Sequence, residues 1–192
     1  MSNADNTNLF WDSCVLIRWL TGSPKDHVND IDQYIQEAKA KKRRIYISTI
    51  LFAEVRSSFL KNKDFGTIFD LLNDFKSAFY PINPTPDIMS RAGQLRDLSF
   101  TKGDAKPRVV GTADAIHLMT CLHLRDELGV SDIVLHTFDE GKGKNWEGKC
   151  VPILGFEDWC EGNKDKELVK RVIDLPRVKP SHLSPELDLK DA

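Results

Sequence analysis

Short apolar runs alternate with longer amphipathic stretches along most of the chain. The runs have the length of buried strands, and most are rich in β-branched and aromatic residues. They are NLFWD (8–12), RIYIST (44–49), AFYPI (78–82), DIVLHTF (132–138) and VPIL (151–154). Between them, apolar residues recur at helical spacing. This alternation predicts an α/β protein with a mostly parallel sheet.

Helices are expected between these strands. Their predicted ranges are 13–20, about 25–42, 48 or 49 through 59, 64–78, 85–98, and 112 to about 128. Hydroxyl side chains can cap three of them, namely Ser13, Ser48 or Thr49, and Thr112. Pro86 suits the first turn of the helix that begins near residue 85.

The length of 192 residues is enough for one domain with a sizeable core. A content of 41% hydrophobic and 29% charged residues is typical of a soluble globular protein, and no apolar stretch approaches the roughly 20 residues that span a bilayer. The first residues lack the pattern of a signal peptide, so a cytoplasmic location is expected.

The composition changes near residue 160, where the chain becomes polar and proline-containing, with few large apolar residues. We therefore expect an α/β domain over 8–160 and a polar C-terminal tail over 161–192. A short helix is expected within it near 165–174. Such a tail is expected to be dispensable for folding but not for assembly or for the choice of partner.

The net charge of −2 does not by itself indicate a polyanionic partner. Basic residues nevertheless cluster in KAKKRR (39–44), which either contributes to a basic rim around an acidic centre or is the solvated end of a helix, where cations are favourable. The four cysteines form no CxxC pair, so reduced thiols are favoured over a zinc knuckle or a disulfide framework.

Four acidic residues lie within or at the ends of apolar runs: Asp12, Glu54, Asp114 and Asp139. Ionised carboxylates rarely enter a core unless they are paired or bound to a cation. Two of them end strands and two lie early on helices, so the carboxyl edge of a parallel sheet can collect all four. Ligands that are all oxygen suit Mg²⁺ or Mn²⁺ rather than zinc. A metal held in this way can activate water for hydrolysis of a phosphodiester.

Four motifs carry these acids in the order LFWDSCVLIRWL, ISTILFAEVRS, TADAIHLMTCLHL and IVLHTFDEG. In order and setting they resemble the motifs of PIN-domain nucleases, most closely the VapC-type toxins, over about residues 8–156. The resemblance implies a three-layer α/β/α fold and cleavage of single-stranded RNA with Mg²⁺ or Mn²⁺. It implies that the four acids form the metal site, in which Asp12, Asp114 and Asp139 hold the metal and Glu54 orients or deprotonates the attacking water.

The resemblance also bears on neighbouring residues and partners. Ser13 and Thr137 would fix the rotamers of the metal-binding carboxylates. A toxin of this kind would work as a homodimer and be silenced by an antitoxin segment that enters the acidic groove. Relatives often place a further acid or amide and an aromatic residue soon after the fourth acid, whereas here a Gly-Lys insertion delays the nearest candidates, Asn145 and Trp146. The loop at 100–111 is longer than in compact toxins.

Several of these residues also have a purely structural interpretation. Asp12 can belong to a helix cap, Asp114 can be an acid near a positive helix end, and Asp139 can begin a glycine-rich turn. Glu54, which has apolar neighbours at helical spacing, suits none of these roles. His117 lies one turn after Asp114 and either touches substrate or metal or is a hydrogen-bonded helix residue.

Two other functions remain open at this stage. A phosphatase of the haloacid dehalogenase type also begins with an aspartate at a strand end, but it normally has a second aspartate two residues later, where this chain has Cys14. A PIN-like scaffold that binds RNA or a protein without cleavage is the other alternative. Such a scaffold has no need of four buried charges, so retention of all four favours a nuclease.

Overall fold

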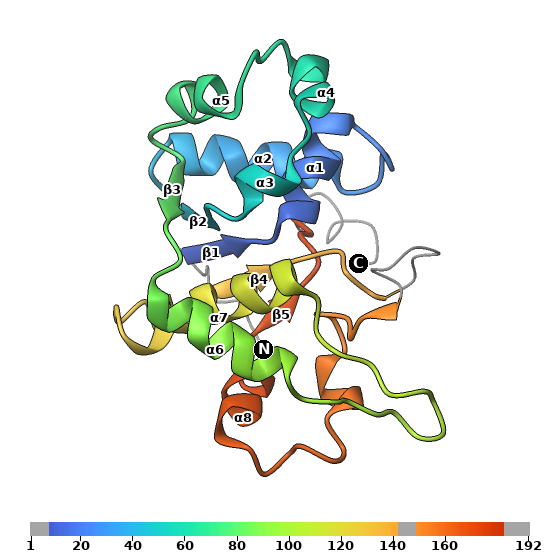
Figure 1. Cartoon of the computed structure of the whole chain (residues 1–192). Helices are drawn as coiled ribbons and strands as arrows, with labels where there is room; N and C mark the ends of the chain where they lie inside the picture. Colours follow the sequence, from blue (N-terminus) through green and yellow to red (C-terminus); the bar gives the residue numbers. More distant parts are fainter. Residues whose placement is uncertain (1–7, 142–148, 183–192) are drawn as a thin grey trace, which may run out of the picture.

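One five-stranded sheet organises the part of the chain that the computed structural model describes, residues 8–141 and 149–182 (Figure 1). Every neighbouring pair of strands is parallel, and the strand order is β3-β2-β1-β4-β5. The strands are β1 (Asn8–Trp11), β2 (Arg44–Ser48), β3 (Phe79–Ile82), β4 (Val134–His136) and β5 (Arg177–Val178). The predicted α/β class and parallel sheet are confirmed.

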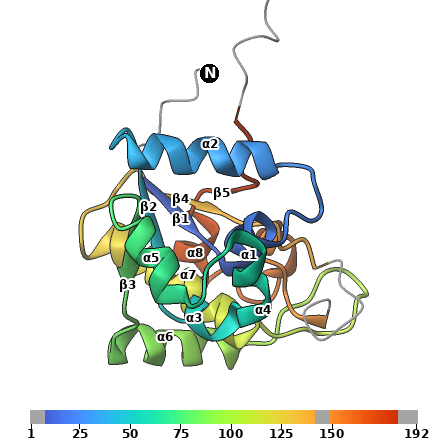
Figure 2. The ribbon, with the colours of Figure 1, turned by 90° about the horizontal axis from the view of Figure 1, so that it is seen from above.

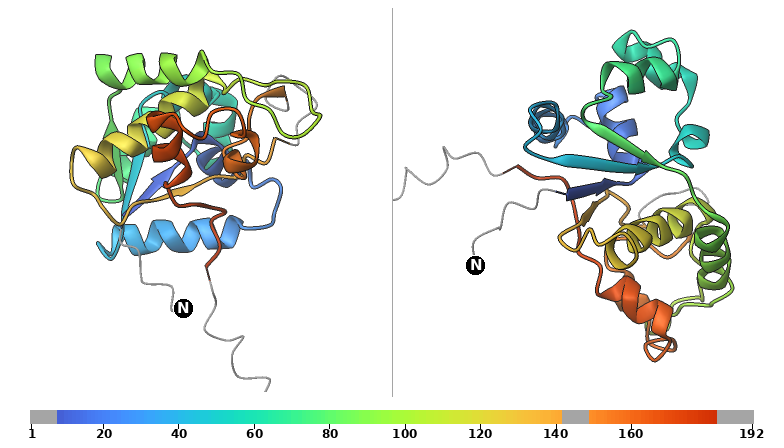
Figure 3. Two further views of the ribbon diagram at one scale, coloured as in Figure 1. Left: turned by 90° about the horizontal axis from the view of Figure 1, so that it is seen from below. Right: turned by 90° about the vertical axis from the view of Figure 1, so that its left-hand side faces the viewer.

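Helices cover both faces of this sheet because its central strands are apolar on both sides. In β1, Leu9 and Trp11 belong to one core and Phe10 to the other, as the alternation of side chains along a strand requires. The sheet therefore separates two hydrophobic cores, and the fold has three layers (Figure 3).

The first layer of helices packs on Leu9 and Trp11 and includes α2, which lies beside α1 when this layer is seen from above (Figure 2). Its helices are α1 (Ser13–Thr21), α2 (Val28–Lys39), α4 (Ser57–Leu60) and α5 (Ile68–Asp74). The second layer packs on Phe10 and consists of α6 (Pro86–Arg96), α7 (Thr112–Asp126) and α8 (Glu167–Ile173). None of the helices in the described ranges is long and apolar enough to cross a membrane.

None of the three predicted hydroxyl caps is present, whereas the expected place of Pro86 in the first turn of α6 is confirmed. Thr85 caps α6 through its side chain, with Pro86 in the first turn. The N-cap position of α1 is Asp12, not Ser13, and that of α7 is Gly111, not Thr112; neither supplies a side-chain cap hydrogen bond. Each predicted hydroxyl instead falls on the first helical residue.

The helix expected from residue 48 or 49 through 59 is interrupted. A single turn, α3 (Leu51–Glu54), ends at Val55, which is extended, and α4 begins after Arg56, which is also extended. Ser48 ends β2 and accepts a hydrogen bond from Thr120 instead of capping a helix. The break leaves Glu54 at the end of a short helix rather than inside a long one.

The segment expected to be a polar tail belongs to the fold through residue 182. In α8, Val169 and Val172 are fully buried in the second core, and Leu175 follows them there. Strand β5 then pairs with β4 along the sheet edge. VPIL, expected as the last strand, forms none, although Val151 and Ile153 are buried. The prediction of a tail is therefore wrong for 161–182, and 183–192 lie outside the described residues.

Candidate active site

The four predicted acids all line one cleft of about 640 Å³ at the carboxyl edge of the sheet. Asp12 directly follows β1, and Asp139 follows β4, which is the neighbouring parallel strand. Glu54 ends α3, and Asp114 lies in the first turn of α7. The structure thus brings together the residues that the sequence selected, at the edge where ligands bind in open parallel sheets.

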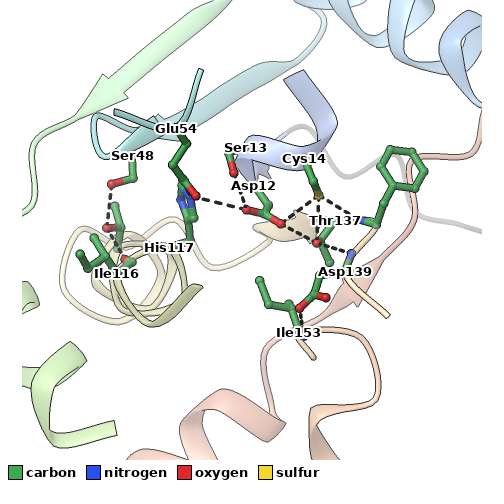
Figure 4. Close-up of polar contacts among 12 residues, drawn as sticks. Asp12, Ser13, Cys14, Ser48, Glu54, Ile116, His117, Thr137, Asp139 and Ile153 are labelled. Atoms are coloured by element: carbon green, nitrogen blue, oxygen red, sulfur yellow. Dashed lines mark hydrogen bonds and ion pairs between the residues drawn. The ribbon is translucent and has the colours of Figure 1, made fainter. Parts of the chain in front are cut away.

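Asp12 is the most buried of the four, at 3% exposure, and several side chains donate hydrogen bonds to it (Figure 4). The Thr137 hydroxyl donates to Oδ2 at 2.7 Å, and the Ser13 hydroxyl lies 3.4 Å from Oδ1. Thr137 also accepts a hydrogen bond from the backbone N–H of Asp139 at 3.0 Å. Both hydroxyls therefore contact the carboxylate whose rotamer they were expected to fix.

Cys14 is a further contact of Asp12 that the sequence did not indicate. Its thiol donates to Asp12 Oδ2 at 2.9 Å, and its sulfur accepts the backbone N–H of Phe138 at 3.1 Å. Burial, the charge of Asp12 and the hydrogen bond to Asp12 raise the pKa of the Cys14 thiol well above its usual value. Cys14 is therefore a neutral donor that ties α1 to the end of β4. The available signal was its position two residues after Asp12.

Glu54 is paired with His117, which projects from α7 (Figure 4). His117 Nε2 lies 2.9 Å from Glu54 Oε2 and 3.5 Å from Asp12 Oδ1, and the ring is fully buried. Burial lowers the pKa of His117, but the hydrogen bond to Glu54 and the charges of Asp12, Glu54 and Asp114 raise it overall. Of its two interpretations, His117 thus has the hydrogen-bonded one.

Asp114 differs from the other acids because it has no hydrogen-bond donor among the described residues. Burial and repulsion from Asp12, Asp139 and Glu54 raise the pKa of Asp114 to about 8, and the attraction of His117 only partly offsets them. An acid that merely capped a helix would be stabilised in its charged form, with a lowered pKa. The cap interpretation therefore does not account for Asp114.

Gly111 makes room for this carboxyl group. A Cβ atom built on Gly111 would lie 2.4 Å from Asp114 Oδ2, closer than non-bonded atoms approach. Gly111 has an ordinary negative φ of −60°, so its lack of a side chain, not its backbone freedom, is what the site uses.

Asp139 combines a structural role with its place in the cleft. Its Oδ1 accepts the backbone N–H of Gly141 at 3.0 Å, as expected for an acid that begins a turn. Its Oδ2 accepts the backbone N–H of Ile153 at 2.8 Å and so holds the chain that returns after residue 149. Asn145 and Trp146, the expected substitutes for a later acid and aromatic residue, lie outside the described residues.

The donor set fits a divalent cation that prefers oxygen. Four carboxylates share one cleft, and burial and the other three carboxylates oppose the charged form of Asp114. As placed, no three His, Cys, Asp or Glu side chains of the described residues converge closely enough to hold a metal. Glu54 faces His117 and Asp139 faces backbone N–H groups instead, so binding would require these side chains to turn.

The rest of the cleft wall was not predicted. It is formed by apolar and aromatic side chains and by two arginines, among them Arg18, Arg56, Phe59 and Phe138. The KAKKRR cluster lies elsewhere, because it joins the end of α2 to the start of β2. It is therefore at the amino ends of the strands, whereas the acids lie at the carboxyl ends. Of its two interpretations, the solvated helix end is the one that agrees with its position.

The comparison with protein families identifies a known domain in this chain. A model of the PIN domain matches residues 9–141, which include all four acids. No curated protein and no solved structure gives a significant match. The match covers more than half of the chain, and the five-stranded parallel sheet flanked by helices is consistent with the fold of the family. The chain therefore belongs to the PIN-domain family, most of whose members are metal-dependent nucleases.

Proposed function

We propose that this protein is an endoribonuclease that cleaves single-stranded RNA with Mg²⁺ or Mn²⁺. The observation that carries the proposal is the state of Asp114, whose ionised form is opposed by burial and by three other carboxylates in the same cleft. Such an accumulation of negative charge costs stability unless a cation neutralises it. It is therefore typical of a site selected for binding a cation.

Asp12, Asp114 and Asp139 are the residues that would hold the metal, in agreement with the sequence-based expectation. The bound cation supplies a Lewis acid that offsets the charge developing on the phosphodiester. Thr137, Ser13 and Cys14 hold the Asp12 carboxylate in place through their hydrogen bonds, and Thr137 in turn donates its backbone N–H to the carbonyl of Val178 in β5. The chain thereby keeps its most buried ligand oriented before any substrate arrives.

Glu54 is the residue that we assign to the attacking water. It is less buried than Asp12, with a side chain that is 28% exposed, so it can reach a water molecule in the cleft. His117 holds one of its oxygens, which leaves the other to accept a proton or a hydrogen bond from water. His117 is a positioning residue in this scheme.

The test of the proposal is cleavage of a labelled single-stranded RNA by the full chain. We expect cleavage with Mg²⁺ or Mn²⁺, none with EDTA, and little with Ca²⁺, which is larger and looser in its coordination geometry. Asp114→Asn should lower the rate at least about a hundredfold, which is what one preorganised electrostatic group contributes. Full activity in EDTA would exclude the metal mechanism.

A scaffold without catalytic activity is the second candidate. The observation that favours it is that Asp139 and Glu54 are engaged by donors within the protein. A scaffold would bind RNA or a protein equally well with and without Mg²⁺ and would show no cleavage in the same assay.

We further propose a role as the toxin of a toxin–antitoxin pair, working as a homodimer. The resemblance of the four motifs to VapC-type toxins supports this role. Induced expression should then arrest growth, Asp114→Asn should abolish the arrest, and co-expression of a small neighbouring gene product should relieve it. Growth that continues unchanged with an active nuclease would contradict the toxin role alone.

A further inference from the structure

The acidic cleft has a second part with the opposite charge. Besides the four acids, its lining includes Arg18 and Arg56, and each of these arginines lies over a phenylalanine ring of the same cleft. The Arg18 guanidinium carbon is 3.6 Å from the centre of the Phe138 ring, and that of Arg56 is 5.8 Å from the centre of the Phe59 ring. Two pairs of a cation and an aromatic ring thus accompany the acids.

The first pair is held in place by the elements that build the acidic site. Arg18 lies one turn after Cys14 on α1, so both side chains lie on the same face of that helix. Asp26 accepts a hydrogen bond from Arg18 at 3.3 Å, and the arginine side chain is only 16% exposed. Phe138 follows Thr137 directly, and its backbone N–H donates to Cys14. This pair is consequently positioned relative to Asp12.

The second pair depends on the break between α3 and α4. Arg56 is extended and exposed, two residues after Glu54, and the helix that follows it carries Phe59, which is partly buried. In a continuous helix, residues two apart point to different sides, so Glu54 and Arg56 would not share one cleft. The interruption therefore brings a cation beside the acid assigned to the attacking water.

We propose that the Arg18–Phe138 and Arg56–Phe59 pairs bind nucleotides of single-stranded RNA next to the phosphate that is cleaved. The guanidinium groups neutralise phosphates that the acids would otherwise repel, and bases stack on the guanidinium planes or on the rings. Stacking needs bases that are not paired in a duplex, which restricts the substrate to single strands or loops. The proposal rests on the proposed nuclease function for the identity of the ligand.

The arginines are tested by binding rather than by cleavage. In the full-length Asp114→Asn protein with EDTA, we would measure the Kd of a fluorescent RNA 12-mer without secondary structure at several salt concentrations. Arg18→Gln and Arg56→Gln should each weaken binding about tenfold and reduce the salt slope by about one. Lys42→Gln, an exposed cation of the KAKKRR cluster at the opposite edge, is the matched control and should leave both quantities unchanged.

The rings are tested with the same RNA and with an abasic strand of equal length. Phe59→Leu and Phe138→Leu should weaken binding of the normal strand about tenfold, the order expected for one lost stack, and should leave the abasic strand unaffected. Phe69→Leu is the control, since Phe69 is 64% exposed on α5 and does not line the cleft. Arg18→Lys keeps the charge and loses the planar group. It should therefore weaken binding of the normal strand, as the loss of a stacking contact does, and leave the salt slope of a phosphate contact unchanged.

The outcomes separate this proposal from the nuclease assignment. If Lys42→Gln weakens binding as much as the two arginine variants, or if the phenylalanine variants bind both strands like the parent, the proposal of two nucleotide-binding pairs is overturned even when the parent chain cleaves RNA. If the variants behave as expected and the chain cuts no RNA, the binding pairs stand and the nuclease assignment fails. Melting curves of each variant check that it is folded, including Arg18→Gln, which also loses the ion pair with Asp26.

Discussion

Replacement of Asp114 by asparagine should stabilise the protein in the absence of metal. Its pKa is raised to about 8, from 3.8 for an ordinary aspartate, by burial and by the neighbouring carboxylates. At a pH between these two values the folded state holds a proton on Asp114 that the unfolded state has released. The contribution of Asp114 to stability is therefore fully present below about pH 4 and is lost as the pH rises towards 8.

The size of the effect follows from the pKa shift. Each pKa unit is worth about 1.4 kcal/mol, so between pH 5 and pH 8 the wild-type protein should lose up to about 4 kcal/mol relative to Asp114→Asn. The cleft is open to solvent, which makes this an upper limit. For a chain of this size about 1 kcal/mol corresponds to 2–4 °C, so we expect the melting temperature of the variant to exceed that of the wild type by several degrees at pH 8.

Thermal melting in EDTA at pH 5 and pH 8 measures this difference directly. Asp104→Asn, which makes the same change at an exposed residue of the 100–111 loop, is the control and should melt like the wild type at both values. Added Mg²⁺ should raise the melting temperature of the wild type more than that of Asp114→Asn, by mass action. A variant that melts below the wild type at pH 8, and by the same margin at pH 5, would refute the electrostatic reasoning.

Three further changes test other parts of the structure. Truncation after Asn163 removes α8 and β5 with three buried aliphatic side chains, each worth about 1.5–3 kcal/mol, so the near-ultraviolet circular dichroism of a folded protein should be lost. Asp139→Asn should destabilise the protein by about 1–3 kcal/mol in urea unfolding, because one backbone N–H loses its acceptor. Gly111→Ala should displace the Asp114 carboxyl group and lower RNA cleavage about a hundredfold, while the melting temperature changes little since a flexible side chain can move aside.

The sequence predicted the strands β1 to β4 and the four acids, and apolar runs were the signal in both cases. A strand buried on both faces is mostly apolar, as in β1 and β4, and an acid beside such a strand is conspicuous. Strand β5 gave no such signal, because it is two residues long and pairs on one side only. The place of β5 depends on how α8 packs in the second core, and the pattern of apolar residues along the chain does not predict this packing.

The break after Glu54 and the second set of cleft residues could not be predicted for a related reason. Val55 fits the helical spacing of its neighbours, so periodicity favours a continuous helix. Only the tertiary contacts of the folded chain favour the interrupted helix. Arg18 and Phe138 meet because α1 and the end of β4 meet, although they are far apart in the sequence. Chemistry that depends on pairs of this kind becomes visible only once the sheet order is known.

The position of β5 has a consequence for synthesis of the protein. Its Val178 carbonyl accepts the backbone N–H of Thr137, the residue whose hydroxyl binds Asp12. A segment that is synthesised after all four acids therefore helps to position the acidic cleft. A nascent chain that has reached residue 160 already carries all four acids but lacks α8 and β5. Because β5 must leave the ribosome before it can pair with β4, the cleft takes its final form only after residue 178 has emerged. The four acids are therefore expected to be synthesised well before the cleft that they line is complete, and a chain that extends only to residue 160 should lack the function of this cleft.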